Sequence, residues 1–487
     1  MAGLTRRDAL TGLAAGFATR GWAEAPVTSP RPKPRGQAVL ANARPSDQAF
    51  VAGAKLGGQV SYVLADLKTG KILAACAPDL PMPPASTVKA ITALYALEQL
   101  GAGQSFATRL LATGPVEAGR LNGDLILAGG GDPTLTTDNL GDLATEIARL
   151  GVRSISGRFC VWAGALPYIA AIDRDQPDWL GYNTAVAGLN LNFNRVNFTW
   201  QQGQGGYEVG FDARAERFAP PVFTSRIQVV ERKLPIFTYE ENGTVESWTV
   251  AKAALGKAGS RWLPVRRPDL YAGDVFQTLA RAEGLELPAA LVLERLPTAR
   301  VLAAHQSGDL RVVLRDMMKF STNMTAEAVG MAASLHRGIA SHDGSAREMA
   351  RWLAGKIGPS DAHFVDHSGL GGASRISAAD MVAALVRLGP VAGLAGLMKA
   401  VTFKENTGPG LRPQRLVAKT GTLNFVSALV GYMTTAHGED RVFAIFSGDA
   451  KRRDAVPDAE NEHPPGLSEW LRRARHLQQQ LLRSWAA

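Results

Sequence analysis

The sequence contains few residues of the kinds that hold metals or covalent cross-links. Its 487 residues include two cysteines, Cys76 and Cys160, in apolar strand-like stretches with no C-x-x-C spacing. This argues against a zinc site or a dense disulfide framework and predicts two buried thiols. The eight histidines are scattered, and none stands in an H-E-x-x-H helix or is paired with a cysteine. We therefore expect no metal and no other cofactor.

The chain also lacks a dense block of one charge and, beyond its N-terminal segment, any apolar run long enough to cross a membrane. The formal net charge of +9 is spread over scattered arginines and lysines without interleaved aromatic residues. This pattern is a weak bias toward anionic polymers and argues against nucleic acid as a partner. With 46% apolar and 20% charged residues, the chain is typical of a globular protein of more than one domain.

The N-terminus has the features of an export signal. Arg6-Arg7 precedes a short, weakly apolar stretch and the small-residue site Ala23-Glu24-Ala25. This order predicts a signal of the twin-arginine type over residues 1–25, and hence a periplasmic protein. Residues 26–37 are rich in proline and basic side chains, which predicts an extended linker.

The first predicted folded element is a hairpin formed by residues 60–66 and 71–76. Between them lies Lys68-Thr69-Gly70, which spells K-T-G. Glycine at this position is typical of a tight turn that needs a positive φ angle. We therefore interpret this K-T-G as part of a turn and give it no catalytic role.

From Phe106 to about Arg300 the sequence changes to many short strand-like runs, among them 226–230 and 244–250, separated by glycine and proline. This texture predicts one or two mostly β accessory domains. The run Gly129-Gly130-Gly131 lacks the spacing of a phosphate-binding loop, and no amphipathic helix is expected to open from it.

A serine and a lysine stand one helical turn apart at the start of an apolar-periodic helix. Ser86 and Lys89 follow Pro84, and the apolar positions after them recur at spacings of three and four. An amine at this distance can accept the serine proton if burial or a neighbouring cation keeps the amine neutral. This is the S-x-x-K arrangement, which by itself is only weakly specific.

Two further motifs follow in the chain. Ser321-Thr322-Asn323 falls at the break between two predicted helices, 310–320 and 325–336. Lys419-Thr420-Gly421 lies on a predicted strand before the hairpin of residues 427–434 and 441–447. The order S-x-x-K, S-x-N, K-T-G, each on a suitable element, is far more specific than any one motif.

With these motifs the chain resembles the penicillin-binding proteins and serine β-lactamases. Within them it is similar to the low-molecular-mass D-alanyl-D-alanine carboxypeptidases and endopeptidases of class C, the peptidase S13 type. Further stretches in that family's order are Gly131-Asp132-Pro133-Thr134-Leu135, Asn192-Phe193-Asn194, Ala326-Glu327 and Asp366 with Ser368-Gly369-Leu370.

The resemblance implies an α+β fold of the serine β-lactamase and DD-peptidase type. A catalytic domain of residues 38–105 and 301–487, with an antiparallel sheet flanked by helices, would be interrupted by the accessory region 106–300. The implied substrates are peptidoglycan stem peptides, and β-lactam antibiotics are implied ligands.

The resemblance also implies the roles of the motif residues. Ser86 is the expected nucleophile and Lys89 its base, while backbone N–H groups of Ser86 and Thr422 form the oxyanion hole. Ser321 relays a proton to the leaving amine, and Asn323 orients Lys89 and the substrate amide. The expected binding site for the substrate carboxylate consists of Lys419, Thr420, Gly421 and Thr422.

The chain departs from the family at Gly371-Gly372, where relatives place Ser-Arg, and at Leu180-Gly181 after Trp179, where they often carry an acidic residue. Neither change touches the motifs, but both leave the recognised peptide side chain open. Two alternatives to a D,D-peptidase also stay open: a serine β-lactamase, and a penicillin- or cell-wall-binding protein without turnover. Preference for carboxypeptidase or endopeptidase activity and the oligomeric state are not determined.

The C-terminal segment 468–485 predicts an amphipathic helix with Ser468 as its N-cap. Its apolar face carries Trp470, Ala474, Leu477, Leu481 and Trp485, and several arginines lie opposite. Such a face can bind a membrane surface or pack on the catalytic sheet. The pattern favours the sheet.

Overall fold

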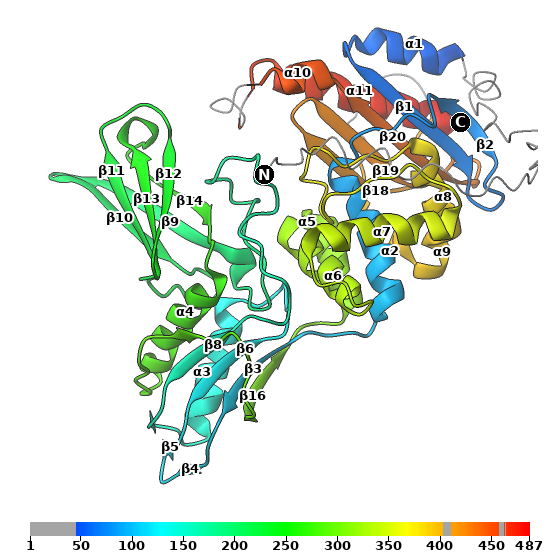
Figure 1. Ribbon diagram of the computed structural model, residues 1–487. Helices are drawn as coiled ribbons and strands as arrows, with labels where there is room; N and C mark the ends of the chain where they lie inside the picture. The colour runs from blue at the N-terminus through cyan, green and yellow to red at the C-terminus, as the bar shows by residue number, and fades with distance from the viewer. Residues whose placement is uncertain (1–44, 403–410, 457–461, 463) are drawn as a thin grey trace, which may run out of the picture. The chain divides into compact units, whose positions relative to one another are not determined.

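The computed structural model describes residues 45–402, 411–456, 462 and 464–487 (Figure 1). The expected export signal (1–25) and linker (26–37) lie outside the described residues. Among the described residues, no helix combines the length and apolar character needed to cross a membrane.

An antiparallel sheet joins the two ends of the chain. Its strand order is β17-β18-β19-β20-β1-β2, so that the early β1 pairs with the late β20. Both predicted hairpins are present, β1 with β2 and β19 with β20. The strands are β1 (Gln59–Asp66), β2 (Ile72–Cys76), β17 (Lys399–Ala400), β18 (Arg415–Leu423), β19 (Val426–Thr434) and β20 (Asp440–Gly448).

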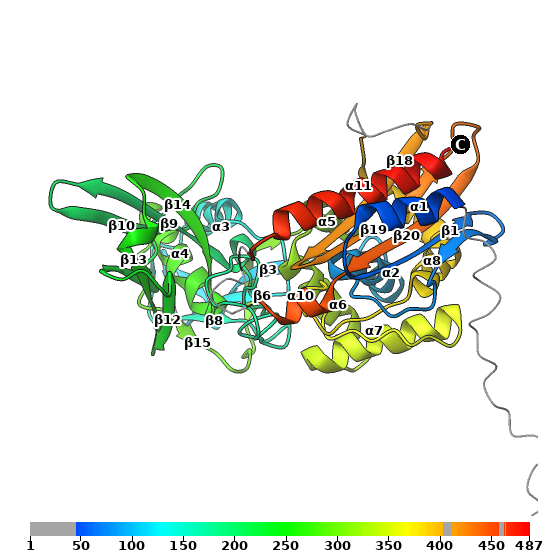
Figure 2. The same cartoon turned by 90° about the horizontal axis from the view of Figure 1, so that it is seen from above.

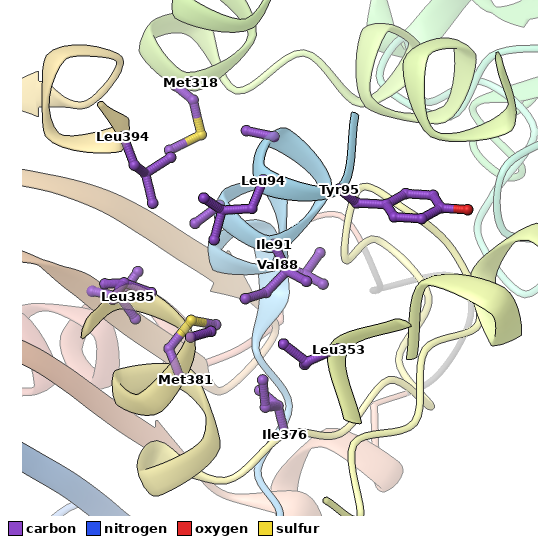
Figure 3. Close-up of a cluster of buried hydrophobic side chains, with 14 of the residues drawn as sticks. Val88, Ile91, Leu94, Tyr95, Met318, Leu353, Ile376, Met381, Leu385 and Leu394 are labelled. Carbon is purple, nitrogen blue, oxygen red and sulfur yellow. The ribbon is translucent and has the colours of Figure 1, made fainter. Parts of the chain in front are cut away.

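One face of this sheet is covered by a group of helices with α2 at its centre. Helix α2 is apolar on nearly all sides, and its residues from Lys89 to Ala96 are buried. Figure 3 shows Val88, Ile91 and Leu94 surrounded by apolar side chains of the neighbouring helices. The predicted helices 310–320 and 325–336 are confirmed, with small shifts in the second. The helices are α2 (Lys89–Leu100), α5 (Leu310–Phe320), α6 (Asn323–Leu335), α7 (His342–Ile357), α8 (Ala378–Arg387) and α9 (Gly389–Ala392).

The opposite face of the sheet is covered by the two terminal helices, α1 (Pro45–Ala54) and α11 (Leu467–Trp485), which lie side by side in Figure 2. Because side chains alternate along a strand, Leu64 and Ile445 point to this face while Val63 and Ala444 point to the other. The short α10 (Ala450–Asp454) follows β20.

Helix α11 packs on the sheet, as its pattern favoured. All five apolar residues of its predicted face are at most 1% exposed, and Trp485 Nε1 donates to Asp47 Oδ2 of α1 at 2.9 Å. This face is therefore not available to a membrane surface. The predicted N-cap was wrong: the cap is Gly466, in the left-handed region at φ 75°, and Ser468 lies inside the helix.

The chain between α2 and α5 forms four further sheets. The strand orders are β15-β8-β6-β3-β16, β10-β9-β14, β11-β13-β12 and β4-β5-β7. The strands are β3 (Ala107–Ala112), β4 (Val116–Glu117), β5 (Arg120–Leu121), β6 (Leu125–Gly129), β7 (Ser154–Ile155), β8 (Phe159–Trp162), β9 (Arg195–Gly203), β10 (Gly206–Asp212), β11 (Ser225–Val230), β12 (Phe237–Asn242), β13 (Val245–Ala251), β14 (Ala258–Pro264), β15 (Leu291–Val292) and β16 (Arg300–Gln306).

Two features of this region were not expected from the sequence. Strand β16, which begins at the expected boundary near residue 300, pairs with β3. The region also contains two long helices, α3 (Thr137–Arg149) and α4 (Pro268–Ala282), whose buried residues share one hydrophobic core with the strands. Helix α3 connects the parallel strands β6 and β8, which need such a crossover.

Helix α3 also overturns the expectation that no amphipathic helix opens from the glycine run. The helix starts seven residues after Gly130 and buries Leu140, Leu143 and Ile147 on one face. Its start is fixed by a capping box, in which Thr136 and Asn139 satisfy each other's backbone N–H groups. The sequence signal was present but weak, because asparagine replaces the usual Glu or Gln.

The two cysteines are free thiols. Cys160 lies buried on β8, as predicted, whereas Cys76 at the end of β2 is partly exposed.

Candidate active site

A cleft of about 880 Å³ brings together residues of the first two predicted motifs and Thr422, which directly follows the third. Ser86, Ser321, Asn323 and Thr422 line it from the part of the chain that carries the antiparallel sheet. The inserted region contributes further polar side chains to the lining: Asp173, Asp175, Gln176 and Tyr182.

Ser86 lies in a short 3-10 helix, Ala85–Val88, that runs directly into α2. The preceding residue, Ala85, has a φ of 47°, in the left-handed region that is costly for a residue with a side chain. This turn presents Ser86 half-buried at the cleft while the next turn buries Lys89 completely. Lys89 Nζ lies 3.0 Å from Ser86 Oγ.

Lys89 is held by three oxygen atoms. Besides Ser86, its Nζ contacts Asn323 Oδ1 and the Ser368 carbonyl, each at 2.7 Å. Burial, and secondly the charge of Lys419, hold the pKa of Lys89 well below its usual value. A neutral amine in this position has a lone pair that can accept the proton of Ser86.

Lys419 stands behind Ser321. Its Nζ donates to Ser321 Oγ and to the Thr420 carbonyl, both at 2.8 Å, and burial lowers its pKa to about 8. Ser321 has a φ of 59° at the break between α5 and α6, which matches the predicted break. A second cation thus lies close to the cleft through a hydroxyl group that could pass on a proton.

The strand β18 passes very close to the turn that carries Ser86. A side chain at Gly421 would place its Cβ 2.7 Å from the Pro84 carbonyl oxygen and 3.1 Å from the Ser86 nitrogen, so only glycine permits this approach. Thr422 reaches the cleft. Thr420 does not line it and instead faces a second pocket of about 240 Å³ with residues of α11.

Two buried carboxylates, Asp366 and Glu327, lie near Lys89, and the sequence pattern predicted no role for either. Asp366 accepts from the Gly369 and Gly371 N–H groups at 2.7 and 2.6 Å, and burial with the nearby Glu327 raises its pKa to about 7. Glu327 accepts from the Ser368 N–H at 2.8 Å. Its position four residues after Asn323 places both on one face of α6, a spacing that could have suggested the link.

The inserted region contributes a contact that no sequence signal indicated. The amide of Asn323 donates from Nδ2 to the Tyr182 carbonyl at 3.0 Å, while its Oδ1 faces Lys89. The orientation of this amide therefore depends on the backbone of the inserted region.

The other K-T-G lies in a hairpin turn, as predicted. Asp66 Oδ1 accepts from the N–H and the hydroxyl of Thr69 at 2.8 and 2.7 Å, and Gly70 has a φ of 71°. Lys68 is exposed there.

The sequence matches the D-Ala-D-Ala carboxypeptidase 3 (S13) family over residues 47–463. A D-alanyl-D-alanine carboxypeptidase of Actinomadura sp. (strain R39) is 28% identical over 447 residues, which cover 82% of this chain and 80% of the relative. The D-alanyl-D-alanine carboxypeptidase DacB of Haemophilus influenzae is 24% identical over 421 residues, or 80% of this chain and 85% of the relative.

The fold is shared with solved structures. The crystal structure of penicillin binding protein 4 (dacB) from Haemophilus influenzae has a TM-score of 0.71 at 23% identity, with 90% of this chain and 99% of that chain covered. The predicted α+β fold is thereby confirmed. Because the family match spans most of the sequence and includes all three motifs, the chain belongs to the D-Ala-D-Ala carboxypeptidase 3 (S13) family.

Proposed function

We propose that this protein is a serine D,D-peptidase that hydrolyses the D-Ala-D-Ala bond of peptidoglycan stem peptides through an acyl-enzyme, and that β-lactams acylate it. The observation that carries the proposal is a fully buried amine, Lys89 Nζ, 3.0 Å from the hydroxyl of Ser86 at an open cleft. Family membership supports the same activity.

In the first step, Ser86 Oγ attacks the carbonyl carbon of the scissile bond while its proton passes to the neutral Lys89. The negative charge that develops on the carbonyl oxygen is stabilised by the backbone N–H groups of Ser86 and Thr422. Such donors contribute about 3–4 kcal/mol each to transition-state stabilisation. The close approach of Gly421 to the Ser86 turn supports this pairing.

The tetrahedral intermediate then releases D-alanine. The proton held by Lys89 reaches the leaving nitrogen through Ser321, whose hydroxyl is hydrogen bonded to Lys419. Water attacks the acyl-enzyme by the reverse proton route and frees Ser86. Lys419 and Thr422 attract the terminal carboxylate of the substrate. Thr420 is not part of this proposal, since it faces the second pocket.

Residues 38–105 and 307–487 form the catalytic domain in this proposal, and residues 106–306 form an accessory region inserted into it. The hydrogen bond from Asn323 to the Tyr182 carbonyl supports a role of the accessory region in shaping the cleft.

Digestion of purified muropeptides, followed by mass spectrometry, tests the activity. We expect pentapeptide monomers to lose one D-alanine, and conversion of cross-linked dimers to monomers would add endopeptidase activity. Protein first saturated with penicillin is the matched control and should yield no product. Steady hydrolysis of penicillin with intact muropeptides would indicate a β-lactamase, and stable acylation without any hydrolysis would indicate a binding protein.

We further propose that the protein works outside the cytoplasm, where its substrate lies, and reaches the periplasm by the twin-arginine route. Changing both Arg6 and Arg7 to lysine should leave unprocessed precursor in the cytoplasm, because this route reads the arginine pair. Immunoblots of cell fractions measure the outcome. Export of the double variant at the parental rate would instead indicate a general secretory signal.

A further inference from the structure

A buried ion pair lies behind the catalytic lysine and takes no part in the steps above. Glu327 on α6 is 0% exposed, and its Oε2 lies 2.9 Å from Nε2 of His342, the first residue of α7. The His342 side chain is 12% exposed and therefore meets solvent directly, whereas Glu327 does not.

Glu327 connects this histidine to Lys89 through two successive hydrogen bonds. Its carboxylate accepts from the N–H groups of His367 and Ser368, at 3.1 and 2.8 Å. The carbonyl of the same Ser368 accepts from Lys89 Nζ at 2.7 Å. The backbone segment that holds the base is thus itself held by Glu327.

The charges of Glu327 and of protonated His342 have opposite effects on the pKa of Lys89. The negative charge of Glu327 favours the protonated form of Lys89, which cannot accept a proton from Ser86. A protonated His342 neutralises that charge, and its contact with Glu327 raises the pKa of His342 despite partial burial. The other groups that face His342 are Asp343 on its own helix, 4.0 Å away, and Asp366 and His367 of the adjoining segment. Burial lowers the pKa of His367 to about 4, so that imidazole is neutral.

We propose that His342 is a positioning residue for Lys89, and that its imidazolium acts through Glu327 by balancing the buried carboxylate and holding it against the Ser368 segment. This inference rests on the proposed role of Lys89 as the base. The consequence is that loss of the His342 charge, with the hydrogen bond retained, makes Lys89 harder to deprotonate.

The test is the pH dependence of the acylation rate of Ser86 by penicillin in the purified full-length protein and its His342→Gln variant. Glutamine keeps an N–H donor but carries no charge. Glu327 stays ionised in this variant because it keeps its two backbone N–H groups. We expect the acid limb of the profile, where the rate rises as Lys89 loses its proton, to move to higher pH by about 0.5 unit. At pH values below the limb, the variant should therefore be acylated about threefold more slowly than the parent. Above the limb the rate should equal that of the parent.

Two further variants separate charge from packing. His342→Lys restores a cation beside Glu327 and should return the limb toward its parental position, which keeps the test decisive if the glutamine variant folds poorly. His336→Gln removes an exposed histidine at the end of α6 and should change nothing. Thermal melts check that all variants are folded.

The proposal would be overturned if the acid limb of the folded His342→Gln variant stayed in place or moved to lower pH. A uniform loss of rate at every pH would then indicate that His342 has a structural role. Failure of the proposed function gives a different result, because muropeptides would then stay intact or penicillin would label the protein at a residue other than Ser86. Muropeptide digestion and peptide mapping of the labelled protein distinguish these failures from failure of the inference about His342.

Discussion

Replacing Ser86 with alanine is expected to abolish covalent labelling by fluorescent penicillin and to lower kcat/KM for a D-Ala-D-Ala peptide by at least ~10⁴-fold, the scale seen when a covalent nucleophile is removed. The physical reason is that, in the part of the chain that the structure describes, Ser86 supplies the hydroxyl that is hydrogen bonded to Lys89 Nζ, whose other contacts are Asn323 Oδ1 and the Ser368 carbonyl. Gel fluorescence measures labelling, and a steady-state assay measures turnover.

The fold should survive this substitution. Lys89 keeps two of its three hydrogen-bond partners, so the variant should lose only about 1 kcal/mol of stability. Ser46→Ala, which removes an exposed hydroxyl at the start of α1, is the matched control and should label like the parent. Equal labelling of folded Ser86→Ala and the parent would refute the assignment of the nucleophile.

Lys419→Ala should lower kcat/KM by ~100-fold or more, equivalent to roughly 3 kcal/mol, as expected for a charge-assisted contact combined with a perturbed base. Three effects act together. The substitution removes the donor that holds Ser321 Oγ, the positive charge proposed to attract the substrate carboxylate, and a charge that lowers the pKa of Lys89. Since that charge lowers the pKa of Lys89, its loss should also move the acid limb of the acylation profile to higher pH.

Lys68→Ala provides the matched control, because it removes the lysine of the other K-T-G. Lys68 is exposed in the turn between β1 and β2, where Asp66 and Thr69 maintain the hairpin without it. Its kcat/KM should stay within a few-fold of the parent. A steady-state comparison of both folded variants in which Lys68→Ala is the impaired one would contradict the proposed architecture.

The elements near the site could be predicted well, because their signals are local. Strand β18, the hairpin of β19 and β20, and the break at Ser321 follow from apolar periodicity and turn residues within short windows. The same windows distinguished the two K-T-G motifs, since one stands in a turn and the other on a strand.

The inserted region was predicted less well, for a physical reason. Helices α3 and α4 are buried against strands that are distant in the sequence, β16 for α3 and β8 for α4. The edge strand β16 is recognisable only through its partner β3, nearly two hundred residues earlier in the chain. The cap of α11 was misplaced because glycine at a left-handed φ replaced the expected serine.

The sequence by itself determined which reactive groups the protein carries and in what order: a serine and lysine one turn apart, a serine and asparagine at a helix break, and a lysine on a strand. These are local facts, since they depend on spacing within one element. Their order along the chain was enough to indicate the family.

Only the tertiary structure decided what surrounds Lys89. Its partners Asn323 and Ser368 lie 234 and 279 residues further along the chain, and Glu327 is hydrogen bonded to the backbone of Ser368. Burial and neighbouring charges set the protonation of an amine, and both arise when the two ends of the chain pair in one sheet. Sequence spacing cannot specify either quantity, because each depends on groups that meet only in the folded protein.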